Sequence, residues 1–116
     1  MVIKSNTHEV ELRGKMRDGD GAVTLTTIAK NGAGLPPKSR LFSDITIPVG
    51  AFIGPHEHVG ETELFYILAG EGVVNDNGTE AAVFAGDTIV TANGQSHSIR
   101  NTGKTELRMI ALIVLD

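Results

Sequence analysis

The chain has 116 residues, enough for one domain, with 41% apolar residues, a net charge of −4 and no cysteine. The absence of cysteine excludes disulfides and thiolate chemistry, and the scattered Lys and Arg residues of an acidic chain argue against a nucleic-acid partner. No apolar run approaches the roughly 20 residues of a membrane span, and the first residues lack the apolar region of a secretory signal, so we expect a cytoplasmic protein without membrane contact.

Short runs rich in Val, Ile, Thr and Phe alternate with glycine-containing turns along the whole chain, which is typical of many short strands. The expected strands, in chain order, span residues 22–29, 40–47, 50–58, 63–69, 71–75, 79–84, 87–92, 96–101 and 106–115. Strands this closely spaced, with no helices between them, predict an all-β fold, either an antiparallel sandwich or a barrel.

The segments between these strands carry turn and loop signals. The Asn77-Gly78 dipeptide tolerates positive φ and predicts a tight hairpin. Residues 31–38 contain two consecutive prolines and predict a longer loop. The best candidate for a helical turn is 8–16, which Gly14 interrupts.

Two of the expected strands, LFYILA at 64–69 and MIALIVL at 109–115, are apolar on both faces. A second sheet and a ligand cavity could cover the two faces, or a partner subunit could bury the outer one. Because an uncovered sheet of this kind would expose a sizeable apolar patch, we expect a homodimer.

Two of the four histidines lie two residues apart in the stretch GPHEHVGETELFY. Residues at this spacing in a strand point to the same face, so the rings of His56 and His58 are expected side by side. Glu63 follows a short turn, and His97 follows another glycine turn far along the chain. Three imidazoles and a carboxylate are costly to bury unless they are paired or bind a cation, and divalent transition metals prefer such ligands. A His-x-His pair alone would indicate only a polar strand surface; Glu63 and His97 favour a metal site.

The spacing in the first of these segments is specific. Gly50 is followed after five residues by His56, after one more by His58, after four by Glu63 and after six by Gly70.

The second segment has an equally regular spacing. Gly86 is followed after five residues by Ala92, after one by Gly94, after two by His97 and after three by Asn101. Together the segments 50–70 and 86–101 resemble the first and second motifs of the cupin superfamily, with Ala92 where the second pattern has proline.

The resemblance implies a cupin-type small β-barrel, a double-stranded β-helix or jelly roll, formed by residues 1–116 as a single domain. It also implies one divalent transition metal per chain, Mn, Fe, Ni or Zn, held by four residues: His56, His58, Glu63 and His97. An octahedral ion with four protein ligands would keep about two positions open for a substrate.

Two functions follow as alternatives. The first is a metal-dependent enzyme of oxygenase, decarboxylase or isomerase type, acting on a small oxygen-rich molecule that chelates the metal. The second is a non-catalytic module that binds or senses a small metabolite or the metal itself. The sequence shows no clear general acid or base, so the catalytic residues are not assigned.

Four residues are candidates for substrate contact. Phe52 shares the strand parity of the two histidines, and Phe65 and Ile67 share that of the carboxylate, although plain barrel core explains all three as well. Arg40 could hold an anionic substrate or form a surface ion pair.

The remaining acidic and histidine side chains near the motifs have simpler interpretations. Glu57 has the opposite parity to the two histidines, and it is expected, like Glu61, to be a solvated charge. His8 matches no motif position and is interpreted as an ordinary polar residue.

Overall fold

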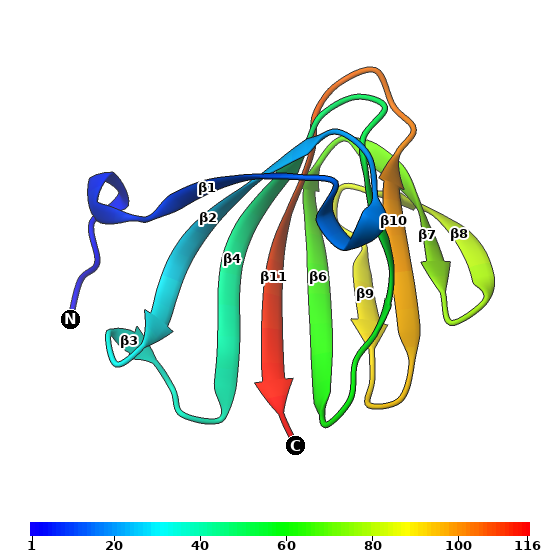
Figure 1. The fold of residues 1–116 in the computed structure, drawn as a ribbon. Coiled ribbons are helices and arrows are strands. Elements are labelled where there is room, and N and C mark those ends of the chain that lie inside the picture. The colour runs from blue at the N-terminus through cyan, green and yellow to red at the C-terminus, as the bar shows by residue number, and fades with distance from the viewer.

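Two antiparallel β-sheets pack against each other in the computed structural model, which describes residues 1–116 (Figure 1). The larger sheet consists, in spatial order, of β1 (Val10–Gly14), β2 (Ala22–Asn31), β4 (Ser39–Ile47), β11 (Leu107–Leu115), β6 (Glu61–Ala69) and β9 (Thr88–Thr91), with the short β3 (Gly34–Leu35) beside β2. The smaller sheet consists of β5 (Phe52–Glu57), β10 (Ser96–Asn101), β7 (Glu71–Asp76) and β8 (Thr79–Phe84). Two 3-10 turns, η1 (Ser5–Thr7) and η2 (Met16–Asp18), flank β1. The predicted all-β fold is confirmed.

The core lies between the two sheets and is built from alternate residues of each strand. In β11, Leu107, Met109 and Ala111 are fully buried, while the residues between them face the opposite side of the sheet. Strands of the smaller sheet supply the facing layer, including Ile53 and Val74. Successive side chains of a strand point to opposite faces, so a sequence in which apolar and polar residues alternate places its apolar side chains in the core.

The β7–β8 hairpin forms where the Asn-Gly dipeptide predicts it. Asp76 pairs with Thr79, and the two residues between them, Asn77 and Gly78, have φ values of 49° and 99°. Both central residues of this two-residue turn therefore have positive φ, as the twist of a tight hairpin requires.

Two strands lie outside the predicted set. Residues 10–14, expected as part of an interrupted helical turn, form β1, which pairs antiparallel with β2. The short β3 forms within the predicted loop 31–38. In β1, Val10 and Leu12 alternate with Glu11 and Arg13, but all residues of the strand are exposed, so it buries neither face and its conformation depends on hydrogen bonds to β2.

The outer face of the larger sheet keeps apolar side chains in contact with solvent. Tyr66, Leu68, Val90 and Val114 are exposed there, and an apolar hollow of about 410 Å³ lies between β4 and β11. This is the face that motivated the homodimer, which stays a prediction. None of the helical turns has the length and apolarity that crossing a membrane would demand.

Candidate metal centre

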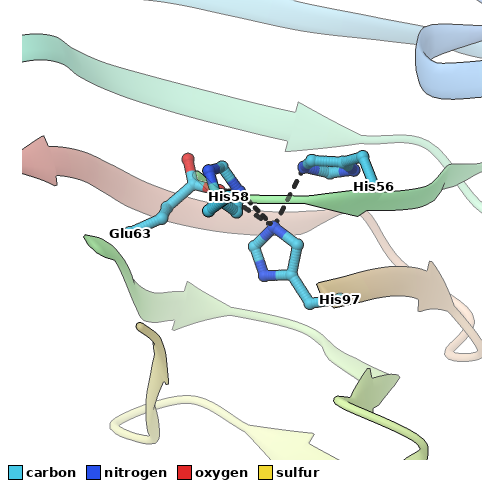
Figure 2. Close-up of side chains that lie close together, drawn as sticks. All are labelled: His56, His58, Glu63 and His97. Carbon is cyan, nitrogen blue, oxygen red and sulfur yellow. Dashed lines mark hydrogen bonds and ion pairs between the residues drawn. The ribbon is translucent and has the colours of Figure 1, made fainter. Parts of the chain in front are cut away.

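Four side chains from both motifs point toward one another between the sheets (Figure 2). His56 in β5 and His97 in β10 are direct cross-strand partners in the smaller sheet. His58 follows the end of β5, and Glu63 lies in β6 of the larger sheet. We call these four residues the donor cluster; their ligand atoms all lie within 4.8 Å of one another, and three of the four residues are buried.

The separations within the donor cluster match the coordination shell of a transition metal. Nε2 of His97 lies 3.0 Å from Nε2 of His56 and 3.0 Å from Nε2 of His58. Oε1 of Glu63 lies 3.0 Å from the Nε2 atoms of both His58 and His97. With metal–ligand bonds of about 2.1 Å, adjacent ligands are about 3.0 Å apart in an octahedral shell and about 3.4 Å apart in a tetrahedral one. These four separations of 3.0 Å therefore fit octahedral coordination.

The hydrogen bonds of two histidines show that lone pairs face the centre of the donor cluster. Nδ1 of His56 lies 2.8 Å from the carbonyl oxygen of Gly54, and Nδ1 of His58 lies 2.6 Å from Oε2 of Glu61. Both oxygens can only accept, so Nδ1 of each neutral ring carries the proton and Nε2 presents its lone pair. Metal-binding histidines in proteins have the same arrangement, with the outer nitrogen donating to a carbonyl or carboxylate.

Hydrogen bonds from His97 cannot satisfy the other three residues of the donor cluster, whose ligand atoms are all hydrogen-bond acceptors. Its Nδ1 lies 2.7 Å from the hydroxyl of Thr91, and Thr91 is fully buried. Even if that hydroxyl donates and Nε2 of His97 carries a proton, one N–H faces three acceptors. Buried acceptors without donors are unfavourable, and a cation at the centre would satisfy all four. The residues present therefore fit a bound metal.

Glu61, expected as a solvated charge, is buried and joins the donor cluster to Arg40. Its carboxylate accepts from Nδ1 of His58 and, at 2.7 Å each, from Nε and Nη2 of Arg40. The hydrogen bonds from Arg40, and then that from His58, lower the pKa of Glu61 to about 2, against the opposing effect of burial. Glu61 therefore remains a carboxylate at neutral and mildly acidic pH. The prediction of a solvated Glu61 is wrong because its partner Arg40 comes from a distant strand; Glu57 is exposed as expected.

A cavity of about 70 Å³ opens on one side of the donor cluster. Its lining includes three residues of the donor cluster, His56, His58 and Glu63, together with two candidates for substrate contact, Arg40 and Phe65. The ring of Phe65 stacks on that of His97, with 5.0 Å between centroids and an angle of 14° between planes. Phe65 therefore both packs against a donor and forms the apolar wall of the cavity.

The other two candidates lie away from this cavity. Ile67 is fully buried in the core, and Phe52 has the guanidinium of Arg100 at 4.6 Å from its ring centroid. Phe52 departs from the expected parity because β5 and β10 change register between the His97–His56 pair and the Ile99–Ile53 pair. One extra residue on β5 makes Ile53, rather than Phe52, share the inner face with the histidines.

The larger hollows of the molecule contain none of the donor cluster. A hollow of about 430 Å³ is lined by the first residues of the chain and by β2, and the apolar hollow of about 410 Å³ lies on the outer face of the larger sheet. The small cavity is therefore the one in which clustered donors and open space coincide.

Acidification is expected to release metal from the donor cluster. Burial lowers the pKa of His56 below its usual 6.5, outweighing the hydrogen bond to Gly54 that raises it; the nearby His97, Arg17 and His58 lower it further. His56 therefore stays neutral to lower pH than an ordinary histidine, and metal affinity should fall as acidification protonates the imidazole ligands. Calorimetric titration with Mn(II) or Zn(II) at several pH values should show this fall and the release of protons on binding. Metal content that is unchanged after dialysis at about pH 4–5 would contradict the assignment.

Comparison with known proteins places this fold and site in a family. A family model described as a cupin domain matches residues 43–114, which include the whole donor cluster. The chain belongs to the cupin family. An oxalate-binding protein from Thermotoga maritima is 43% identical to this cupin over 115 residues, covering 99% of this chain and 94% of that protein.

Solved cupin structures share the architecture. A crystal structure from Thermotoga maritima, described as a predicted oxalate decarboxylase, has a TM-score of 0.94 and 41% sequence identity, and the match covers 100% of both chains. The polyketide cyclase of Streptomyces resistomycificus has a TM-score of 0.78 over 99% of this cupin and 78% of that chain, with 14% identity. At that identity the second likeness shows the fold alone.

Proposed function

We propose that this cupin binds one divalent transition metal through the donor cluster and, on that metal, a small dicarboxylate of the size of oxalate. The observation that carries the proposal is the convergence of four lone-pair atoms beside a cavity of about 70 Å³. Mn(II), Fe(II), Ni(II) and Zn(II) are all suited to imidazole and carboxylate ligands. When bound, such a cation supplies a Lewis acid with open positions that two oxygens of one small molecule can occupy.

The size of the cavity limits the ligand to a few atoms. A group the size of a water molecule needs roughly 10–15 Å³ of cavity volume. A cavity of about 70 Å³ therefore accommodates about five or six non-hydrogen atoms. Oxalate has six, and its two carboxylates can chelate a metal in a five-membered ring. Longer dicarboxylates would meet the apolar walls formed by Phe65, Ile53 and Leu41.

The charges around the donor cluster favour an anion once the metal is present. Glu61 and Glu63 contribute two negative charges and Arg40 one positive charge, so these three side chains carry a net charge of −1. A divalent cation reverses this to +1 in a largely buried site, where electrostatic attraction is stronger than in water. The relative named an oxalate-binding protein supports the same class of ligand.

Binding without turnover is favoured by the side chains that line the cavity. The only carboxylate among them is Glu63, which we assign to the metal, and Glu61 is held by both Arg40 and His58. No free acid or base therefore lies where it could move a proton of a bound molecule. Turnover, of decarboxylase, oxygenase or isomerase type, is the second candidate, supported by the open coordination positions and by the solved neighbour described as a predicted decarboxylase.

Calorimetry on metal-loaded protein tests this function. We expect oxalate to bind the Mn(II)-loaded protein and not the chelator-treated protein, and we expect succinate to bind at least about tenfold more weakly because of the small cavity. Elemental analysis of protein purified without chelator identifies the resident metal. Assays of CO₂ release and O₂ uptake then separate binding from turnover.

The proposal fails if Mn(II)-loaded protein does not bind oxalate, or if chelator-treated protein binds it equally well. Conversion of oxalate at a steady rate would establish turnover in place of simple binding.

A further inference from the structure

We infer that Arg17 is the residue that binds the free carboxylate oxygens of the metal-chelated dicarboxylate and so sets the selectivity for dianions. This inference rests on the proposed function, because it assumes an anion on the metal. The sequence offered Arg40 for this role. The structure points to Arg17, which lies in η2 between β1 and β2.

Three arginines line the cavity, and Arg17 is the one whose side chain has no ionic partner. Arg40 is held by both carboxylate oxygens of Glu61, and Arg13 is paired with Glu11 at 2.6 Å. Arg17 forms no ion pair and no side-chain hydrogen bond, yet it lines the same cavity as His56 and His58. A guanidinium presents a planar fork of donors that matches the two oxygens of a carboxylate.

The backbone that presents Arg17 is strained. Lys15, Arg17 and Asp18 all have left-handed conformations, with φ values of 49°, 53° and 61°. Residues with a Cβ rarely adopt this region, and a run of such residues persists only where the surrounding structure imposes it. Strain of this kind concentrates at binding sites and ligand clamps.

Contacts with β5 hold η2 in this conformation, beside the strand that carries His56. Asp20 and Phe52 exchange two backbone hydrogen bonds, of 3.0 and 3.2 Å. Glycines allow the approach: a Cβ on Gly19 would lie 2.0 Å from the carbonyl oxygen of Phe52, and one on Gly54 would lie 1.9 Å from that of Arg17. The strained turn is therefore locked against the strand that carries His56.

The charge of Arg17 completes the match to a dianion. The two buried carboxylates, Arg40 and a divalent metal leave a net charge of +1, and Arg17 raises it to +2. A ligand with two negative charges then neutralises the site. Arg13 adds nothing to this balance because Glu11 neutralises it.

The test compares oxalate binding to Mn(II)-loaded wild-type protein and to Arg17→Gln. Loss of charge-assisted hydrogen bonds should raise the Kd for oxalate by about 10–100-fold. The Kd for Mn(II) should not rise, because removing a nearby positive charge favours a bound cation, and the Kd of the loaded protein for imidazole, a neutral ligand of the open metal positions, should stay within about twofold. Arg17→Lys should retain part of the oxalate affinity, since it keeps the charge and loses the fork.

Two control comparisons address position and nonspecific charge. Arg13→Gln removes a cation from the same cavity and should change oxalate affinity by less than about threefold. Gly19→Ala should push η2 away from β5 and weaken oxalate binding while Arg17 is still present. Gly14→Ala, where an added Cβ meets nothing within 4 Å, is its matched control and should bind oxalate normally.

The outcomes separate this inference from the proposed function. If wild-type loaded protein binds oxalate and Arg17→Gln binds it equally well, the inference is overturned and the proposed function stands. If Arg17→Gln weakens imidazole or Mn(II) as much as oxalate, Arg17 supports the metal site and does not bind the anion. If loaded wild-type protein does not bind oxalate, the proposed function fails and the inference fails with it.

Discussion

His58→Ala is expected to reduce metal affinity by more than about 100-fold, the largest effect of any single substitution in the donor cluster. Nε2 of His58 lies 3.0 Å from both His97 and Glu63, and its Nδ1 connects the cluster to Glu61. Loss of one of four ligands should exceed the roughly 10–100-fold effect typical of outer hydrogen-bond partners. Metal content by elemental analysis and Kd by competition with a chromophoric chelator measure the change.

The folded structure should survive this substitution. The backbone N–H of His58 donates to Gln95, and its carbonyl accepts from Gly94, so alanine keeps both bonds. The far-ultraviolet circular dichroism spectrum should therefore be unchanged. The thermal stabilisation of wild-type protein by metal, about 2.7 kcal/mol at a concentration 100 times the Kd, should disappear.

His8→Ala is the control, because His8 lies before β1 and outside the donor cluster. It should retain full metal content. A loss of metal equal to that of His58→Ala would mean that the ligands are misassigned.

Glu61→Gln is expected to weaken metal binding by about 10–100-fold although Glu61 is not one of the four donors. The carboxylate accepts from Arg40 with both oxygens and from His58 with one of them. An amide has only one acceptor oxygen, so in either orientation its NH₂ group faces an N–H of Arg40, and in one orientation it also faces the Nδ1–H of His58. The proton on Nδ1 and the orientation of the ring then lose their support, and the Nε2 lone pair is no longer directed at the metal.

Glu57→Gln removes an equal charge from an exposed position on β5 and should leave the Kd for metal unchanged. Metal Kd and unfolding by urea should both be measured for the two variants, because the loss of a partly buried ion pair should also destabilise Glu61→Gln by about 1–3 kcal/mol. Equal metal affinity in Glu61→Gln and wild type would show that Arg40 and Glu61 do not position His58.

The strand pattern and the spacing of the four metal-ligand residues can be predicted from the sequence alone. Alternating apolar residues mark the buried strands, and the Asn77-Gly78 dipeptide marks the β7–β8 hairpin, because both depend on backbone geometry over a few residues. The placement of His56 beside His58, two residues apart, has the same local origin. The resemblance to the cupin motifs then identifies Glu63 and His97 as their companions.

The sequence-based predictions were wrong where the pairing between two strands, and not the pattern within one strand, determines the structure. The strand β1 has only two apolar residues, Val10 and Leu12, and buries neither of them, so its short pattern does not identify it as a strand; hydrogen bonds to β2 hold it in place. Phe52 is placed outside the cavity by a register shift between β5 and β10, which reverses parity within a single strand. Both features depend on pairing with a second strand, so the sequence of the first strand alone does not determine them.

Local periodicity and motif spacing thus specify a small all-β cupin with four potential metal donors. The packing of two sheets specifies what surrounds those donors: the carboxylate of Glu61 between Arg40 and His58, and the strained turn that brings Arg17 to the cavity. The sequence of a strand determines which of its side chains share a face. A contact such as that between Arg40 and Glu61, which are 21 residues apart, depends instead on how different strands pair and pack.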